Sequence, residues 1–146
     1  MFFPMRVLIV EACKELAENL VEVLDSFGYR ADQAGSGAQA LQQVASHRYD
    51  CIVLNALLPD TDGADLIQEL RMADHSLRFV VMAALLGDRM TERVEAAGAS
   101  SVVSTLDSAR LVSDLARELR PGRPAGAVRS RSYGWLGRRR APNVLR

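Results

Sequence analysis

The sequence predicts an α/β fold of the doubly wound class, in which helices cover both faces of a five-stranded parallel sheet. Three observations lead to this fold class. Short, nearly continuous apolar runs alternate with longer segments of helical periodicity, strand always precedes helix, and five such units fill about 115 residues. Continuous apolar strands are typical of parallel sheets that are buried on both faces, and right-handed crossovers leave few topologies.

The first two units follow this rule. A strand is expected at 6–10 (RVLIV), and a helix at 13–27 ends where Gly28 provides a left-handed stop. A weaker strand at 29–34 suits the edge of a sheet, and a helix follows at 38–47 after a Gly-Ser-Gly turn. The apolar face of the first helix is predicted to contain Leu16, Leu20, Val23, Leu24 and Phe27.

The remaining three units have clearer apolar strands. We expect strands at 51–55, 79–83 and 101–104, and helices at 64–72, 88–97 and 108–119. The chain shows no internal repeat, so these units form one domain, 1–120.

Charge is distributed unevenly along the chain. Residues 1–120 carry 18 acidic and 11 basic side chains, whereas residues 121–146 carry seven Arg and no acid. Three Pro and four Gly in this basic tail cannot bury a core, so we expect it to be disordered unless it is bound. Its candidate contacts are Arg131, Tyr133, Trp135, Arg138, Arg139 and Arg140.

The tail has three interpretations. It is a solvated extension, it contacts a protein (including the acidic body of its own or another copy), or it binds nucleic acid through Arg–phosphate contacts and aromatic stacking. No apolar run approaches the roughly 18 residues of a membrane span, and the apolar start lacks a charged leader, so we expect a cytoplasmic protein without membrane contact.

Two cysteines, Cys13 and Cys51, are too few for a disulfide framework. They are expected near opposite ends of adjacent strands, which argues against a bridge. Cys13 lies near a helix start that could activate it, and a buried, inert thiol is the favoured interpretation.

The stretch 51–63 (CIVLNALLPDTDG) is the centre of the chain's chemistry. Its buried strand stops at the polar Asn55, and ligands of open α/β sheets bind at the carboxyl ends of the strands. Asp60 and Asp62 flank the following turn, and we expect them to form that turn rather than to hold a cation.

Several stretches resemble the receiver domain of bacterial two-component response regulators, the CheY-like family, over residues 5–120. The residues that carry the resemblance are VLIVE (7–11), LDSFGYRADQAGSGAQAL (24–41), CIVLNALLPDTDG (51–63) and GAS (98–100). The resemblance implies a flavodoxin-like, three-layer αβα fold with strand order 2-1-3-4-5. It also implies an active site at the carboxyl ends of strands 1, 3, 4 and 5.

The reactive positions depart from that family. A typical receiver has two acids after strand 1, a phosphate-accepting Asp after strand 3, Ser or Thr after strand 4 and Lys-Pro after strand 5. Glu11 matches in part, but Ala12 replaces the second acid, which is normally the main metal ligand. The other positions hold Asn55, Ala83 and Thr105, and Leu106 follows in place of Pro.

Chemistry alone argues against phosphoryl transfer at these five positions (11, 12, 55, 83 and 105), which we call the corner. An amide is a poor nucleophile, and Mg²⁺ prefers anionic oxygens, of which only Glu11 is offered. Each lost contact to the transferred group costs about 3 kcal/mol of barrier. We therefore predict a non-enzymatic protein without metal or cofactor, with a well-packed pocket in which Asn55 hydrogen-bonds to neighbouring backbone.

The function predicted from these features is that of a pseudo-receiver, a phosphorylation-independent interaction module in signalling. The resemblance implies a protein partner, or a homodimer, on the face formed by 88–97, 101–104 and 108–119; a plain solvated surface is the alternative. The candidate contacts there are Arg89, Glu92, Arg93, Val102, Arg110, Asp114 and Arg117. Two other functions stay open: a nucleic-acid-associated regulator that uses the tail, and a receiver phosphorylated at a non-standard site.

Overall fold

The computed structural model describes residues 5–106 and 108–119, which form ten elements in strict alternation. The strands are β1 (Arg6–Val10), β2 (Arg30–Ala34), β3 (Cys51–Asn55), β4 (Arg78–Ala83) and β5 (Ser101–Ser104). The helices are α1 (Lys14–Ser26), α2 (Gly37–Ser46), α3 (Gly63–Ala73), α4 (Asp88–Ala97) and α5 (Ser108–Glu118). The tail contacts predicted between 131 and 140 lie outside the described residues.

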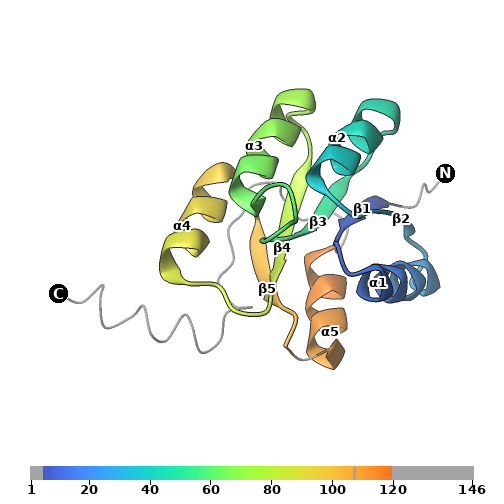
Figure 1. Ribbon diagram of the computed structural model, residues 1–146. Helices are drawn as coiled ribbons and strands as arrows, with labels where there is room; N and C mark the ends of the chain where they lie inside the picture. The colour runs from blue at the N-terminus through green and yellow to red at the C-terminus, as the bar shows by residue number, and fades with distance from the viewer. Residues whose placement is uncertain (1–4, 107, 120–146) are drawn as a thin grey trace.

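The five strands form one parallel sheet with the order β2-β1-β3-β4-β5. Figure 1 shows the three layers, with α2, α3 and α4 on one face of the sheet and α1 and α5 on the other. The predicted doubly wound, flavodoxin-like fold and its strand order are therefore confirmed. None of the helices in the described ranges is both long and apolar enough to cross a bilayer.

The core is divided by the sheet into two clusters, because side chains alternate along a strand. Leu8 and Val10 of β1 join the cluster beneath α2, α3 and α4, whereas Val7 and Ile9 join the cluster beneath α1 and α5. The four interior residues of β3, Cys51 to Leu54, have no exposed surface. This burial on both faces is what their continuous apolar sequence predicts.

One predicted helix face needs correction. Phe27 was expected in the apolar face of α1 but is 53% exposed, and Val23 is only partly buried. Leu20 and Leu24 are buried as predicted, Leu16 packs against the same cluster, and Ala17 is a further buried member of this face. The helix ends at Ser26, so Phe27 falls in the turn after it rather than on the inner face. Gly28, with φ of 91°, then reverses the chain as predicted.

Candidate functional site

The candidate site lies where β1, β3, β4 and β5 end. Glu11 directly follows β1, Asn55 is the last residue of β3, Ala83 ends β4, and Thr105 directly follows β5. Backbone hydrogen bonds join these ends: the Thr105 N–H donates to the Ala83 carbonyl (2.9 Å), and the Ala56 N–H donates to the carbonyl of Met82 (2.8 Å). The fold thus gathers at one edge the positions that the sequence singled out.

Glu11 and Asn55 form the centre of this edge. Asn55 Nδ2 donates to Glu11 Oε1 at 2.7 Å, and the Cys13 N–H donates to Glu11 Oε2 at 2.9 Å. Asn55 Oδ1 accepts from the Leu57 N–H at 3.0 Å, which confirms the predicted bond to neighbouring backbone. Glu11 is only 5% exposed, so hydrogen bonds from the Asn55 amide and the Cys13 N–H replace the water that would otherwise solvate its carboxylate.

The positions around this pair carry little functional chemistry. The Ala12 methyl is exposed, Ala83 is buried at 6% exposure, and Thr105 is half-buried with a single hydroxyl. Within 5–106 and 108–119, no group of three His, Cys, Asp or Glu side chains is placed to hold a metal ion. The donor set that the described residues offer here does not fit Mg²⁺, because it contains one carboxylate, Glu11, and Mg²⁺ prefers several anionic oxygens.

The two acids of the β3–α3 loop act as helix caps. Asp60 accepts from the Gly37 N–H (2.9 Å) and the Ala38 N–H (3.0 Å), so it ties the loop to the start of α2. The Gly37 and Ala38 donors hold the pKa of Asp60 below its usual value. Asp62 caps α3 by accepting from the Asp65 N–H at 2.9 Å. They therefore do more than shape their own turn, because they also fix the loop that follows Asn55.

The predicted partner face changes once burial is known. Val102 and Asp114 are each 3% exposed, so neither side chain is available for the direct contact predicted from the sequence. Val102 points into the cluster beneath α4. Asp114 lies on the inner side of α5 and pairs with Arg117 (3.3 Å) and Arg110 (3.8 Å) of its own helix.

The guanidinium group of Arg93 also forms ion pairs within the molecule. It pairs with Asp62 at 3.0 Å and with Asp65 at 3.2 Å, which links α4 to the first turn of α3. Arg89 and Glu92 are exposed on the same helix. The exposed part of the predicted face therefore centres on Arg89, Arg110 and Arg117.

The two cysteines differ from each other. Cys51 is fully buried, and desolvation raises the pKa of its thiol to about 12, so it is inert at neutral pH. Cys13 is exposed, and the expectation of a buried thiol is wrong for it, because it lies at the N-cap position of α1, above the core, where its side chain makes no capping hydrogen bond. Both thiols are free, as predicted.

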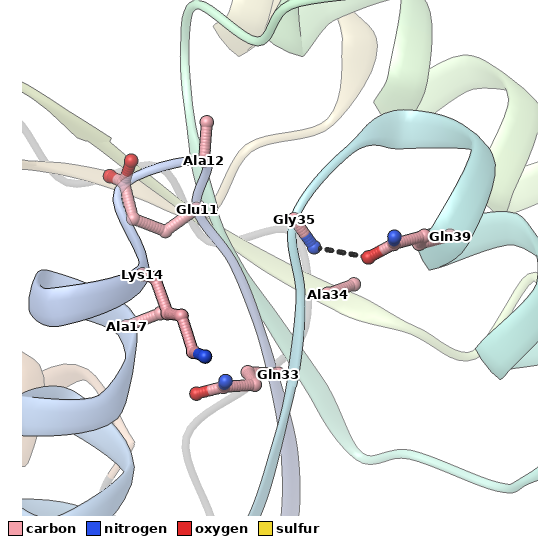
Figure 2. Close-up of a pocket in the computed structure, with 8 residues that line it drawn as sticks. All are labelled: Glu11, Ala12, Lys14, Ala17, Gln33, Ala34, Gly35 and Gln39. Atoms are coloured by element: carbon pink, nitrogen blue, oxygen red, sulfur yellow. Dashed lines mark hydrogen bonds between the residues drawn. The ribbon is translucent and has the colours of Figure 1, made fainter.

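A pocket of about 240 Å³ lies beside Glu11 on the β2 side of the edge. Figure 2 shows Lys14 and Gln33 extending into it, while Gln39 accepts from the Gly35 N–H at 2.7 Å. Sequence reasoning did not identify this pocket. The one available signal was the strand order, which places the β1–α1 and β2–α2 loops side by side. Its lining residues are Glu11, Ala12, Lys14, Ala17, Gln33, Ala34, Gly35 and Gln39.

Comparison with known proteins gives a consistent result. The family model for the response regulator receiver domain matches residues 7–115. Response regulator MprA of Mycobacterium sp. (strain KMS) is 33% identical over 91 residues, which are 62% of this chain and 39% of that protein. MprA of Mycobacterium leprae (strain TN) is 34% identical over 90 residues, again 62% and 39%. The chain thus spans about two fifths of the length of these curated relatives.

Solved structures show the same fold. The non-phosphorylated HemR receiver domain from Leptospira biflexa has a TM-score of 0.74 and 27% identity, covering 82% of this chain and 98% of that one. A two-component response regulator from Clostridium difficile has a TM-score of 0.73 and 23% identity, covering 82% and 99%.

Proposed function

Because the chain belongs to the response regulator receiver domain family, we propose that it is a receiver-type signalling module whose output does not depend on phosphorylation. One observation carries the proposal. The position of the acceptor carboxylate holds Asn55, and its amide nitrogen donates at 2.7 Å to Glu11, the one carboxylate among the described residues at the ends of β1, β3, β4 and β5. The pair is a closed, internally satisfied contact rather than a reactive one.

Three separate requirements of phosphoryl transfer are unmet at this corner. An amide oxygen is a weak nucleophile and cannot form an acyl phosphate. A divalent cation finds a single carboxylate, Glu11, among the described residues at these strand ends, and therefore one formal negative charge. The developing charge on a transferred phosphoryl group meets the methyl group of Ala83 and one hydroxyl at Thr105.

The module acts through protein contacts in this proposal, as a cytoplasmic, non-catalytic component of a signalling pathway. The exposed side chains of Arg89, Arg110 and Arg117, together with the exposed Glu92 of α4, offer a mainly basic surface for a partner or for a second copy of the chain. Arg110 and Arg117 also pair with the buried Asp114. Without a chemical switch, the activity of the module is constitutive or follows its abundance.

The direct test is phosphorylation itself. We expect the 146-residue chain, incubated with acetyl phosphate and Mg²⁺, to show no added phosphoryl mass by intact mass spectrometry. We also expect Mg²⁺ with beryllium fluoride to leave the melting temperature unchanged within about 1 °C, since a ligand stabilises only a state that binds it. A receiver that retains the acceptor Asp is the control.

A phosphoryl group on the protein would contradict the proposal, and peptide mapping would locate it. A phosphoryl group attached at the corner would mean that this chain is phosphorylated at the usual place of a receiver domain. Attachment elsewhere would support the alternative of a receiver that is phosphorylated at a non-standard site.

A second candidate function is favoured by the charge distribution. The seven Arg of residues 121–146, with Tyr133 and Trp135 among them, suit phosphates and stacked bases. If the tail binds DNA, we expect the affinity, measured by anisotropy of a labelled duplex, to fall steeply with salt. The log–log slope is about −0.9 for each phosphate contacted. Binding should then disappear in a chain that ends at Arg120, and a salt-independent signal would argue against this function.

A further inference from the structure

Three leucines stand at equivalent places in successive loops of the carboxyl edge. Leu57, Leu85 and Leu106 each lie two residues beyond the last residue of β3, β4 and β5. They are 65%, 64% and 61% exposed. Since these three strands are neighbours in the sheet, the leucines form a row across the edge, which we call the leucine row. An exposed apolar row of this kind is typical of a contact surface rather than of scattered surface residues.

Two of the three leucines in the row, Leu57 and Leu106, lie in hydrogen-bonded turns. Asn55 Oδ1 accepts from the Leu57 N–H at 3.0 Å, and Ser104 Oγ accepts from the Leu106 N–H at 3.2 Å. In both loops a polar side chain at the end of the strand thus fixes the backbone two residues later. The Leu57 loop is further held by an isolated β-bridge to Asp62. Little conformational entropy is therefore lost when a partner covers these side chains.

The position at which the described chain stops favours one occupant. Helix α5 begins just after the Leu106 loop and runs 11 residues, about 17 Å, before the chain reaches Leu119. Thirteen residues separate Leu119 from Tyr133, and an extended chain of that length reaches about 45 Å. The segment beyond Leu119 is therefore long enough to return along α5 to the leucine row.

The composition of that segment matches the apolar character of the leucine row and the net negative charge of residues 1–120. Tyr133, Trp135 and Leu136 gather three large apolar side chains within four residues. Residues 121–146 carry seven positive charges and no negative one, and residues 1–120 carry an excess of seven negative charges. Covalent linkage gives such a segment a local concentration in the millimolar range, so even a weak apolar contact is populated.

We propose that residues 133–136 of the chain's own tail cover the leucine row in an intramolecular contact. This inference is independent of the phosphorylation state of the corner.

Trp135 provides the test, because it is the only tryptophan of the chain. In the 146-residue chain we expect the Trp135 emission to be blue-shifted relative to that of a free 120–146 peptide. We also expect a quenching constant for acrylamide at least about twofold below that of a Leu57→Ser/Leu85→Ser/Leu106→Ser variant, since a contact populated half the time halves quencher access. These leucines are exposed, so the variant is expected to fold, which circular dichroism checks. Met72→Ser on α3, a position 81% exposed, is the matched control and should leave Trp135 protected.

The remaining outcomes each count against the proposal. Emission and quenching equal to those of a free 120–146 peptide would show that the tail does not dock. Protection that survives the triple Leu→Ser change would place the contact elsewhere. Protection that rises with protein concentration, together with dimers in light scattering, would assign the occupant to a second copy. Protection that needs added DNA or another protein would assign it to that partner.

Discussion

Asn55→Asp is expected to destabilise the protein by about 3 kcal/mol at neutral pH, although the two side chains have nearly the same shape. The substitution replaces the Nδ2 donor, 2.7 Å from Glu11 Oε1, with a second carboxylate oxygen. Glu11 is 5% exposed, so solvent cannot screen the repulsion well. Chemical denaturation of the wild type and the variant at pH 7 measures the difference directly.

The pH dependence of this variant has a defined sign. Two carboxylates in contact disfavour each other's ionisation, so the pair titrates in the folded state with at least one pKa above the unfolded values near 4. Between the unfolded and folded pKa values the folded state binds more protons, and stability therefore falls as pH rises. The destabilisation should be largest above the raised pKa and should nearly vanish below about pH 4. The wild type measured over the same range is the reference.

Two controls separate charge repulsion from other effects of the substitution. Asn19→Asp makes the same chemical change on the exposed side of α1 and should cost only a few tenths of a kcal/mol. Mg²⁺ should raise the melting temperature of Asn55→Asp, which offers paired carboxylates, and leave the wild type unaffected. Equal losses in the two variants, or a loss that does not change with pH, would mean that the Glu11 contact does not stabilise this corner.

The Glu11–Asn55 pair shows where sequence reasoning stopped. The apolar run at 51–55 predicted a buried strand and its polar end, so Asn55 was found. Its partner required knowledge that β1 and β3 are adjacent and that Val10 lies opposite Leu54, which places the next residues, Glu11 and Asn55, opposite each other. The spacing of apolar residues along the chain does not specify which residues of two strands lie opposite each other. The strand order itself followed from the family resemblance rather than from the hydrophobic pattern.

Other differences have the same origin in non-local contacts. Asp114 was expected on the partner face from the family resemblance, but flanking Arg110 and Arg117 allow it to be buried at 3% exposure. Asp60 was expected to serve its own turn, yet it caps α2, 23 residues earlier in the chain. Local pattern predicts which residues form a helix or strand, and it does not predict which side chain from another loop completes its end.

Restoring the missing groups is expected to have the largest functional effect. The combined variant Ala12→Asp/Asn55→Asp/Ala83→Thr/Thr105→Lys should acquire one phosphoryl group from acetyl phosphate in the presence of Mg²⁺, where the wild type acquires none. Each restored group supplies about 3 kcal/mol of transition-state stabilisation. Together they are expected to raise the rate of phosphorylation by many orders of magnitude. Intact mass spectrometry provides the readout, and peptide mapping should place the group on the new Asp at position 55.

The structure supports this expectation because the scaffold around the corner is intact. The Gly63 N–H donates to the Ala56 carbonyl at 2.7 Å, and a Cβ on Gly63 would lie 3.1 Å from the Ala56 Cα, so the turn after β3 keeps its tight form. Ala12 is exposed and Thr105 is half-buried, which leaves space for the longer side chains, and only Ala83 requires local repacking. The matched control keeps Asn55 and carries the other three changes; it should remain unmodified, because it lacks the nucleophile. A folded fourfold variant that stays unmodified would show that the corner differs from a working receiver in backbone geometry as well as in charge.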